Sequence, residues 1–309
     1  MSVLPELSAR KETSTAEVVK PLRVPKEFLG PPPGLINPTL LMFLVAVAVI
    51  ALSTLGHFLW HWPGWCSFWP NVLALHMVGT VIHDASHRAA HRNPIMNAML
   101  GHGSALMLGF AFPVFTRVHL QHHAHVNDPD NDPDHFVSTG GPLWLIAVRF
   151  FYHEVFFFKR RLWRKYELLE WCLSRLVVAA IVFASCQYGF LGYILNCWFC
   201  PALVVGITLG FFFDYFPHRP FAERDRWKNA RVYPSAILNV LILGQNYHLV
   251  HHLWPSIPWY KYQPAYVATK PLLDEKGCHQ SIGLFKGKDF RGFLYDIFLG
   301  IRWHGHHKH

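Results

Sequence analysis

Residues 119–123 read His119-Leu120-Gln121-His122-His123, and residues 248–252 repeat this HxxHH spacing as His248-Leu249-Val250-His251-His252. A third stretch, His83-Asp84-Ala85-Ser86-His87, places two histidines four residues apart. On a helix, positions i, i+3 and i+4 lie on one face, so each stretch presents its imidazoles together. With 22 histidines in 309 residues, chance predicts HxxHH only roughly 0.1 times in such a chain. The three stretches therefore predict a metal site.

The number and type of the ligands narrow the choice of metal. Eight imidazoles exceed what one ion needs, which favours a dinuclear centre, and structural zinc sites usually close with four ligands and favour cysteine. Imidazole suits iron, copper, zinc and nickel. Because neutral ligands leave a two-metal site strongly cationic, an oxidised metal with anionic oxygen species compensates the charge best. This argument favours iron that activates O2, and it leaves copper and zinc open.

The composition indicates an integral membrane protein. Hydrophobic residues make up 52% of the chain and charged residues 15%, whereas a typical soluble chain has about 25% charged residues. These values exclude a disordered, collagen-like or coiled-coil chain. The net charge of +9 comes from cations that flank apolar runs. Contact with lipid headgroups and the positive-inside rule explain them better than nucleic acid, so no nucleic-acid partner is expected.

The cysteines are expected to be thiols. Cys197 and Cys200 have the CxxC spacing, but they lie in an apolar run without a second pair. We interpret them as membrane-buried thiols and not as a redox or zinc pair. No signal peptide is expected, because the first ~35 residues are polar and rich in proline.

The distribution of apolar runs predicts four membrane spans. Residues 1–37 form a basic arm, residues 38–303 the membrane domain, and residues 304–309 a histidine-rich tail that we expect to be dispensable, including His306, His307 and His309. The runs long or apolar enough to matter cover residues 38–60, 68–82, 94–115, 171–187 and 188–216.

One of these runs must turn back. If residues 94–115 crossed the bilayer, His119 and His83 would lie on opposite sides, about 30 Å apart. We therefore expect this run to be re-entrant or interfacial, as its glycines and Pro113 allow. The predicted fold is all-α and integral to the membrane, with about four transmembrane helices, re-entrant or interfacial helices, and a cytosolic histidine-rich di-iron cap. Both termini and all histidine stretches then lie in the cytosol.

The three stretches resemble the histidine boxes of the membrane-bound fatty acid desaturase and hydroxylase superfamily. The surrounding sequence resembles cyanobacterial-type β-carotene ring hydroxylases more closely, over about residues 35–303. Four segments carry this narrower resemblance: residues 79–87 (GTVIHDASH), 101–104 (GHGS), 127–135 (NDPDNDPDH) and 245–255 (QNYHLVHHLWP).

The resemblance implies a ligand set. Family members recruit a further histidine about 30 residues before the third box, and His218 holds that position here. The implied ligands are His83, His87, His119, His122, His123, His218, His248, His251 and His252. Acyl desaturases have an asparagine, which holds a metal-bound water, at the position of Asp214. Asp214 is thus a possible ligand, hydrogen-bond acceptor or helix-end residue. His91, His125 and His135 are further candidates, for which outer or surface positions are favoured.

The acidic run Asp128, Asp130, Asp132 and Asp134 does not predict calcium. Pro133 occupies the glycine position of an EF-hand loop, and Thr139 occupies the position of its last glutamate. Alternating Asp and Pro is typical of a tight turn. An aspartate of this turn can still orient a ligand histidine through its second ring nitrogen.

The resemblance also implies an activity: O2-dependent hydroxylation of the β-ionone ring at C3 by two iron ions, from β-carotene to cryptoxanthin and zeaxanthin. The carotenoid would enter from the bilayer, with Phe110, Phe112, Phe115 and Trp254 as candidate lining residues. A separate electron donor, a ferredoxin, is expected, because the sequence has no flavin or nucleotide fingerprint. The expected location is the thylakoid or plasma membrane of a photosynthetic bacterium.

Two kinds of alternative stay open. A carotenoid 4-ketolase or an acyl-lipid desaturase would use the same histidine boxes. A histidine-rich metal transporter belongs to a different class, but transporters tend to place their ligands at the bilayer midplane, inside the spans. The boxes here lie at the ends of predicted spans, which disfavours transport.

Overall fold

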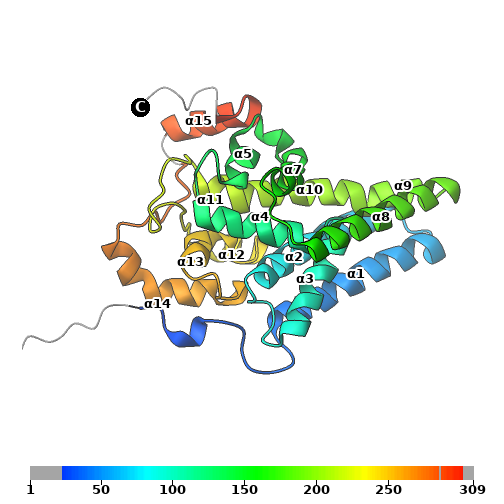
Figure 1. Ribbon diagram of the computed structural model, residues 1–309, viewed down its shortest axis with the longest axis horizontal. Coiled ribbons are helices and arrows are strands. Elements are labelled where there is room, and N and C mark those ends of the chain that lie inside the picture. The colour runs from blue at the N-terminus through cyan, green and yellow to red at the C-terminus, as the bar shows by residue number, and fades with distance from the viewer. Residues whose placement is uncertain (1–22, 285–286, 302–309) are drawn as a thin grey trace, which may run out of the picture.

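The structure, a computed structural model, describes residues 23–284 and 287–301 (Figure 1). Its elements are helices, and within the described residues the only β-type pairing is an isolated bridge between Arg231 and His279. The all-α prediction is therefore confirmed. The tail 304–309 and most of the predicted arm lie outside the described residues.

Four helices are long and apolar enough to cross a membrane, as predicted. They are α1 (Pro38–Trp60), α2 (Gly64–Ser86), α8 (Lys165–Gln187) and the continuous helix Leu191–His218, which contains α9 (Leu191–Ile194), α10 (Cys200–Leu209) and α11 (Phe216–His218). In Figure 1 these long helices extend together to the right. Helix α2 is longer than the apolar run 68–82, so His83 lies in its last turn. The fourth span ends at His218 itself.

Local sequence explains where the first span begins. The side chain of Asn37 caps α1 by accepting a hydrogen bond from the backbone N–H of Leu40 at 2.9 Å, and Pro38 occupies the first turn. The amide of Asn37 also donates to the carbonyl of Ala90 at 3.0 Å. The start of the first span is thereby tied to the loop that follows the first histidine stretch.

The run 94–115 forms two helices that meet at a sharp bend, a geometry shared by re-entrant hairpins and broken spans. Helices α3 (Pro94–Leu108) and α4 (Phe112–His125) meet at an angle of 101°. Gly109 forms the elbow with a φ of +83°, and a Cβ there would lie 2.7 Å from the ring of Trp198. Glycine is needed on both counts, because other residues rarely adopt this φ and no side chain fits the space. The elbow turns α4 back toward the end of α2.

Shorter helices gather at one end of the spans, on the left and at the top of Figure 1. They are α5 (Pro133–Thr139), α6 (Ile146–Arg149), α7 (Tyr152–Lys159), α12 (Ala236–Leu241), α13 (His248–Leu253), α14 (Tyr262–Glu275) and α15 (Gly287–Phe298). A core of fully buried side chains that includes Leu249, Val250 and Tyr262 packs α13 against α14. This packing fixes the third histidine stretch.

The cysteines agree with the thiol prediction. Cys197 is buried and Cys200 is partly buried within the fourth span, and both are free. The amide of Asn71 donates to the carbonyl of Cys197 at 2.6 Å and links the second span to the fourth.

We predict that the α3–α4 pair enters and leaves the membrane on one side. Arg92, before α3, and Asp130, after α4, are both exposed. In a background without native cysteines, Arg92→Cys and Asp130→Cys should react with an impermeant maleimide from the same side of sealed vesicles. Tyr188→Cys, between α8 and α9, should react only from the other side. Labelling of positions 92 and 130 from opposite sides would mean that the pair crosses the bilayer.

Candidate metal centre

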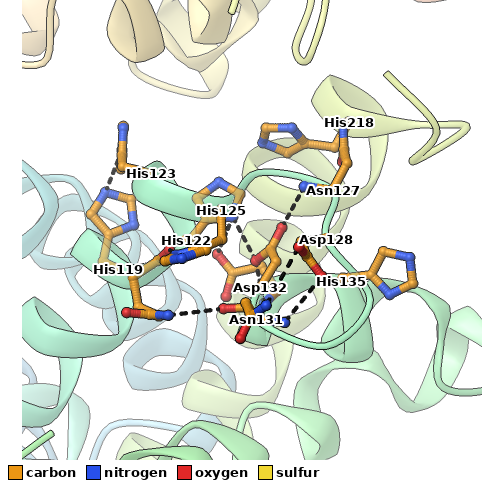
Figure 2. A network of polar contacts seen from close by, with 12 residues as sticks. His119, His122, His123, His125, Asn127, Asp128, Asn131, Asp132, His135 and His218 are labelled. Atoms are coloured by element: carbon orange, nitrogen blue, oxygen red, sulfur yellow. Dashed lines mark hydrogen bonds and ion pairs between the residues drawn. The ribbon is translucent and has the colours of Figure 1, made fainter. Parts of the chain in front are cut away.

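The structure brings all nine predicted histidines to one place at the end of the spans. The last turn of α2 and the residue after it supply His83 and His87, and the end of the fourth span supplies His218. Helix α4 and helix α13 supply three each: His119, His122, His123, His248, His251 and His252. Figure 2 shows the histidines of α4 together with His218 and the acidic turn that follows α4.

These imidazoles form two groups of four. The first group is His83, His87, His119 and His251, and the second group is His122, His218, His248 and His252. Within each group one nitrogen per ring lies within 4.8 Å of the others. In the second group the Nε2 atom of His248 lies 3.1 Å from that of His218 and 3.0 Å from that of His252. Such separations match nitrogens that share an ion at about 2.0–2.1 Å.

His123 belongs to neither group and lies between them. Its Nε2 atom is 3.2 Å from that of His119 and 2.9 Å from that of His251, both in the first group. Its ring stacks on His252 of the second group, with centroids 4.3 Å apart. Its Nε2 atom is therefore within reach of an ion that the first group would hold.

Unpartnered nitrogens support a metal site. Both ring nitrogens of His83 and the Nε2 atom of His87 are buried without a hydrogen-bond partner. Buried polar atoms without a partner are rare because their desolvation is costly. A metal ion supplies the missing partner, so the residues present fit a metal centre with imidazole ligands.

Outer hydrogen bonds turn the Nε2 atoms inward. His122 donates from Nδ1 to Asp132 at 2.9 Å, and His218 donates from Nδ1 to the carbonyl of Asn229 at 2.9 Å. The Nδ1 atom of His251 lies 3.1 Å from the hydroxyl of Tyr262. Such contacts fix the orientation of a metal-binding imidazole. An aspartate of the acidic run thus holds the second nitrogen of a box histidine, as the sequence suggested.

The acidic turn is itself well anchored. Asp132 caps α5 by accepting from the N–H of Asp134 at 2.9 Å, and it accepts from the N–H of Asn127 at 2.8 Å. Asp134 lies 3.5 Å from Nδ1 of His122 and 2.7 Å from Nε2 of His153. The loop conformation therefore places the carboxylates of Asp132 and Asp134 beside the imidazole of His122.

Burial and charge give the imidazoles different proton affinities. Burial, followed by neighbouring imidazoles, holds the pKa of His248, His251 and His252 well below its usual range. Burial also opposes protonation of His122, but Asp132 and Asp134 outweigh it and raise the pKa of His122 to about 9. Neutral imidazole is the metal-binding form, so most of the cluster needs no proton loss, whereas His122 releases a proton when it binds a metal.

Three candidate histidines lie outside both groups. The Nε2 atom of His91 contacts the carbonyl of Leu35 at 3.0 Å, and Nδ1 of His125 contacts the carbonyl of Gln121 at 3.2 Å. His135 contacts Thr139, and its ring packs on Phe221. None of the three is a member of either group.

Asp214 lies at the centre but in neither group. It is buried within the continuous fourth span, so it does not end a helix. Its Oδ2 atom has no hydrogen-bond partner, and the residue lines the cavity described next.

A cavity of about 440 Å³ reaches the cluster, where His83, His119, His122 and His248 form part of its wall. Of the four residues that the sequence proposes for the substrate's path, Phe110 and Phe115 line this cavity, and their rings continue a stack toward His119. Phe112 and Trp254 are not among its lining residues. Phe112 faces α3, where a Cβ on Gly101 would lie 2.4 Å from its ring, and Trp254 faces Trp227.

Most residues of the cavity wall were not predicted from the sequence. The fourth span contributes Trp198, Ala202, Gly206, Leu209 and Phe213, which recur every three or four residues and so share one helix face. The pair Arg175 and Glu154 also lines the cavity: Arg175 lies 3.3 Å from Glu154 and donates to the carbonyl of Gly109 at 2.8 Å.

Comparison with known proteins identifies the family. Residues 60–282 match the family described as Fatty acid desaturase, and the chain belongs to it. The dihydrorhizobitoxine desaturase of Bradyrhizobium elkanii is 30% identical over 69% of this chain and 70% of its own length. A β-carotene ketolase of Paracoccus sp. (strain N81106 / MBIC 01143) is 30% identical over 59% of this chain and 70% of its own. The sn-1 oleoyl-lipid 12-desaturase of Anabaena variabilis is 26% identical over 60% of this chain and 62% of its own length.

The family is one of membrane oxidoreductases, and together with the two histidine groups it supports a metal site in this chain. The names of these relatives are those of desaturases and a ketolase, so they support the broader resemblance and not ring hydroxylation as such.

We predict that each chain binds two metal ions. We also predict that replacing a histidine lowers the metal content if that histidine belongs to one of the two groups, and leaves it unchanged if the histidine lies outside the cluster. His252→Ala removes a second-group ligand and should reduce the metal content of the purified protein below two. His125→Ala, on α4 but outside both groups, should keep two ions. Elemental analysis checks both variants. Full metal content in His252→Ala, or equal losses in the two variants, would show that the grouping does not describe the ligands.

Proposed function

We propose that the protein is a di-iron oxygenase that hydroxylates the β-ionone ring of carotenoids at C3, converting β-carotene to cryptoxanthin and then zeaxanthin. The observation that carries this proposal is the apolar, aromatic cavity whose wall includes histidines of both groups. A cavity of this kind accepts a hydrocarbon ring from the bilayer and brings its C–H bonds to the cluster.

The nine box and span histidines would hold the irons, which supply the activation of O2 needed to oxidise an unactivated C–H bond. The surrounding residues of the chain orient the ligand rings and shape the cavity. The Nδ1 contacts of His122, His218 and His251 orient the ligand rings. Phe110, Phe115 and Phe213 exclude water and limit how the ring can lie.

Ring hydroxylation is favoured by sequence within and around the boxes. Residues 79–87, 101–104, 127–135 and 245–255 resemble β-carotene ring hydroxylases. A carotenoid ketolase and an acyl-lipid desaturase are the competitors, because two similar relatives carry the name β-carotene ketolase and two carry the name sn-1 oleoyl-lipid 12-desaturase. The position of the substrate C–H bond relative to the iron decides whether hydroxylation, ketolation or desaturation occurs. A shift of about 1 Å in that position can change a rate about 10²-fold.

The proposal includes a cytosolic orientation and a separate electron donor. The segment 159–165 carries five cations and no acidic residue just before the third span, as the positive-inside rule requires of a cytosolic segment. A ferredoxin is the proposed donor, and the thylakoid or plasma membrane of a photosynthetic bacterium is the proposed location.

Expression in a β-carotene-accumulating bacterium that supplies a ferredoxin tests the reaction. We expect cryptoxanthin and zeaxanthin by pigment chromatography, and neither product from His122→Ala. Echinenone or canthaxanthin would assign a ketolase instead. New acyl double bonds with unchanged pigments would assign a desaturase.

If the substrate ring binds in the cavity, filling the cavity with a large side chain should block turnover. Ala202 lines the cavity, whereas Ala180 on α8 is exposed on the membrane-facing surface. Ala202→Trp fills the space that the ring needs, so turnover of β-carotene should fall at least about 10²-fold with an unchanged metal content. Ala180→Trp adds the same side chain outside the cavity and should keep both activity and metal. Normal turnover by Ala202→Trp would show that substrate binds elsewhere.

A further inference from the structure

The two histidine groups differ in the charge that surrounds them. In the second group, His122 donates from Nδ1 to Asp132 at 2.9 Å, and Asp134 lies 3.5 Å from the same nitrogen. Both carboxylates are almost completely buried, with 2% and 9% of their side chains exposed. Water therefore screens their charge little, and its effect on the nearest metal position is strong.

In the part of the chain that the structure describes, no carboxylate is hydrogen-bonded to the first group. Its outer contact is neutral, between Nδ1 of His251 and the hydroxyl of Tyr262. The nearest acid in sequence, Asp84, accepts instead from the hydroxyl of Thr39 at 3.3 Å and the N–H of Trp259 at 3.2 Å.

A carboxylate hydrogen-bonded to a ligand imidazole makes that ligand more basic and favours a more highly charged metal. Neutral ligands, including His123 beside the first group, do not add negative charge. The ferric state is therefore stabilised relative to the ferrous state at the second position only.

We propose that the two iron positions have different reduction potentials, and that Asp132 and Asp134 keep the iron of the second group oxidised longer. The first electron then goes to the iron of His83, His87, His119 and His251, and the second electron to the iron of the second group. This inference rests on the proposed di-iron centre but not on the identity of the substrate.

A reductive titration tests it without substrate. The full-length protein, loaded with ⁵⁷Fe, is titrated anaerobically with dithionite in the presence of redox mediators, and Mössbauer spectra count ferric and ferrous iron at each potential. We expect two one-electron steps and a sample containing one ferric and one ferrous iron between them. Because the charge of one iron also affects the other, the response of each step to substitution carries the test.

Asp132→Asn removes the charge while keeping the shape of the side chain. It should shift the second step to a more positive potential and leave the first step in place. Asp134→Asn should produce a smaller shift of the same sign. Asp128→Asn is the matched control, because this carboxylate of the same turn accepts from the backbone of Asp130 and Asn131 and contacts no box histidine. It should move neither step.

Tyr262→Phe serves as the control for the first group and should alter only the first step. An equal shift of both steps in Asp132→Asn, a shift of the first step alone, or no shift would overturn the proposal. Iron content is measured for every variant. If Asp132→Asn loses iron, Asp134→Asn carries the test, because the Asp134 side chain does not cap a helix.

The outcome is separable from that of the proposed function. Two unequal steps in a protein that makes no hydroxylated carotenoid would refute the substrate and keep the asymmetry. Zeaxanthin formation by a protein whose irons respond identically to Asp132→Asn would support the proposed substrate and refute the asymmetry.

Discussion

The structure depends on one geometric requirement: imidazoles from four distant segments must meet at one point at the end of the membrane spans. The second span ends at Ser86, with His83 in its last turn and His87 directly after it, and the fourth span ends at His218. The other six histidines come from α4 and α13. Between the first and second histidine stretches the chain therefore cannot cross the membrane an odd number of times. The 101° bend at Gly109 meets this condition, and the pair formed by α8 and the fourth span meets it for His218.

Bringing the imidazoles together would cause strong repulsion if they were protonated, and the surrounding residues determine which of them carry a proton. Nine imidazoles packed together, six of them buried and three partly buried, cannot all be charged. Burial and mutual repulsion keep the pKa of the α13 histidines low. His122 is the exception, because the turn after α4 brings Asp132 and Asp134 to its outer nitrogen. That turn needs the capping bonds of Asp132, so the alternating Asp-Pro sequence has both a structural and an electrostatic consequence.

Much of this was predictable from sequence because it rests on helical spacing and span length. The box histidines share helix faces, and the need for one metal site required residues 94–115 to turn back. His218 was found through its family spacing. The cavity wall was predicted poorly because helix rotation decides which aromatic side chain faces inward. Phe110 and Phe115 face the cavity, but Phe112 faces α3. The Arg175–Glu154 pair joins α7 and α8, and no local pattern predicts such a tertiary contact.

The central claim is that the histidines form two adjacent metal positions with separate ligand sets. Anomalous scattering at the iron absorption edge, from crystals of the iron-loaded protein, measures this most directly. Two anomalous peaks are predicted, one inside the group of His83, His87, His119 and His251 and one inside the group of His122, His218, His248 and His252. A single peak shared by both groups, or a peak outside them, would contradict the account.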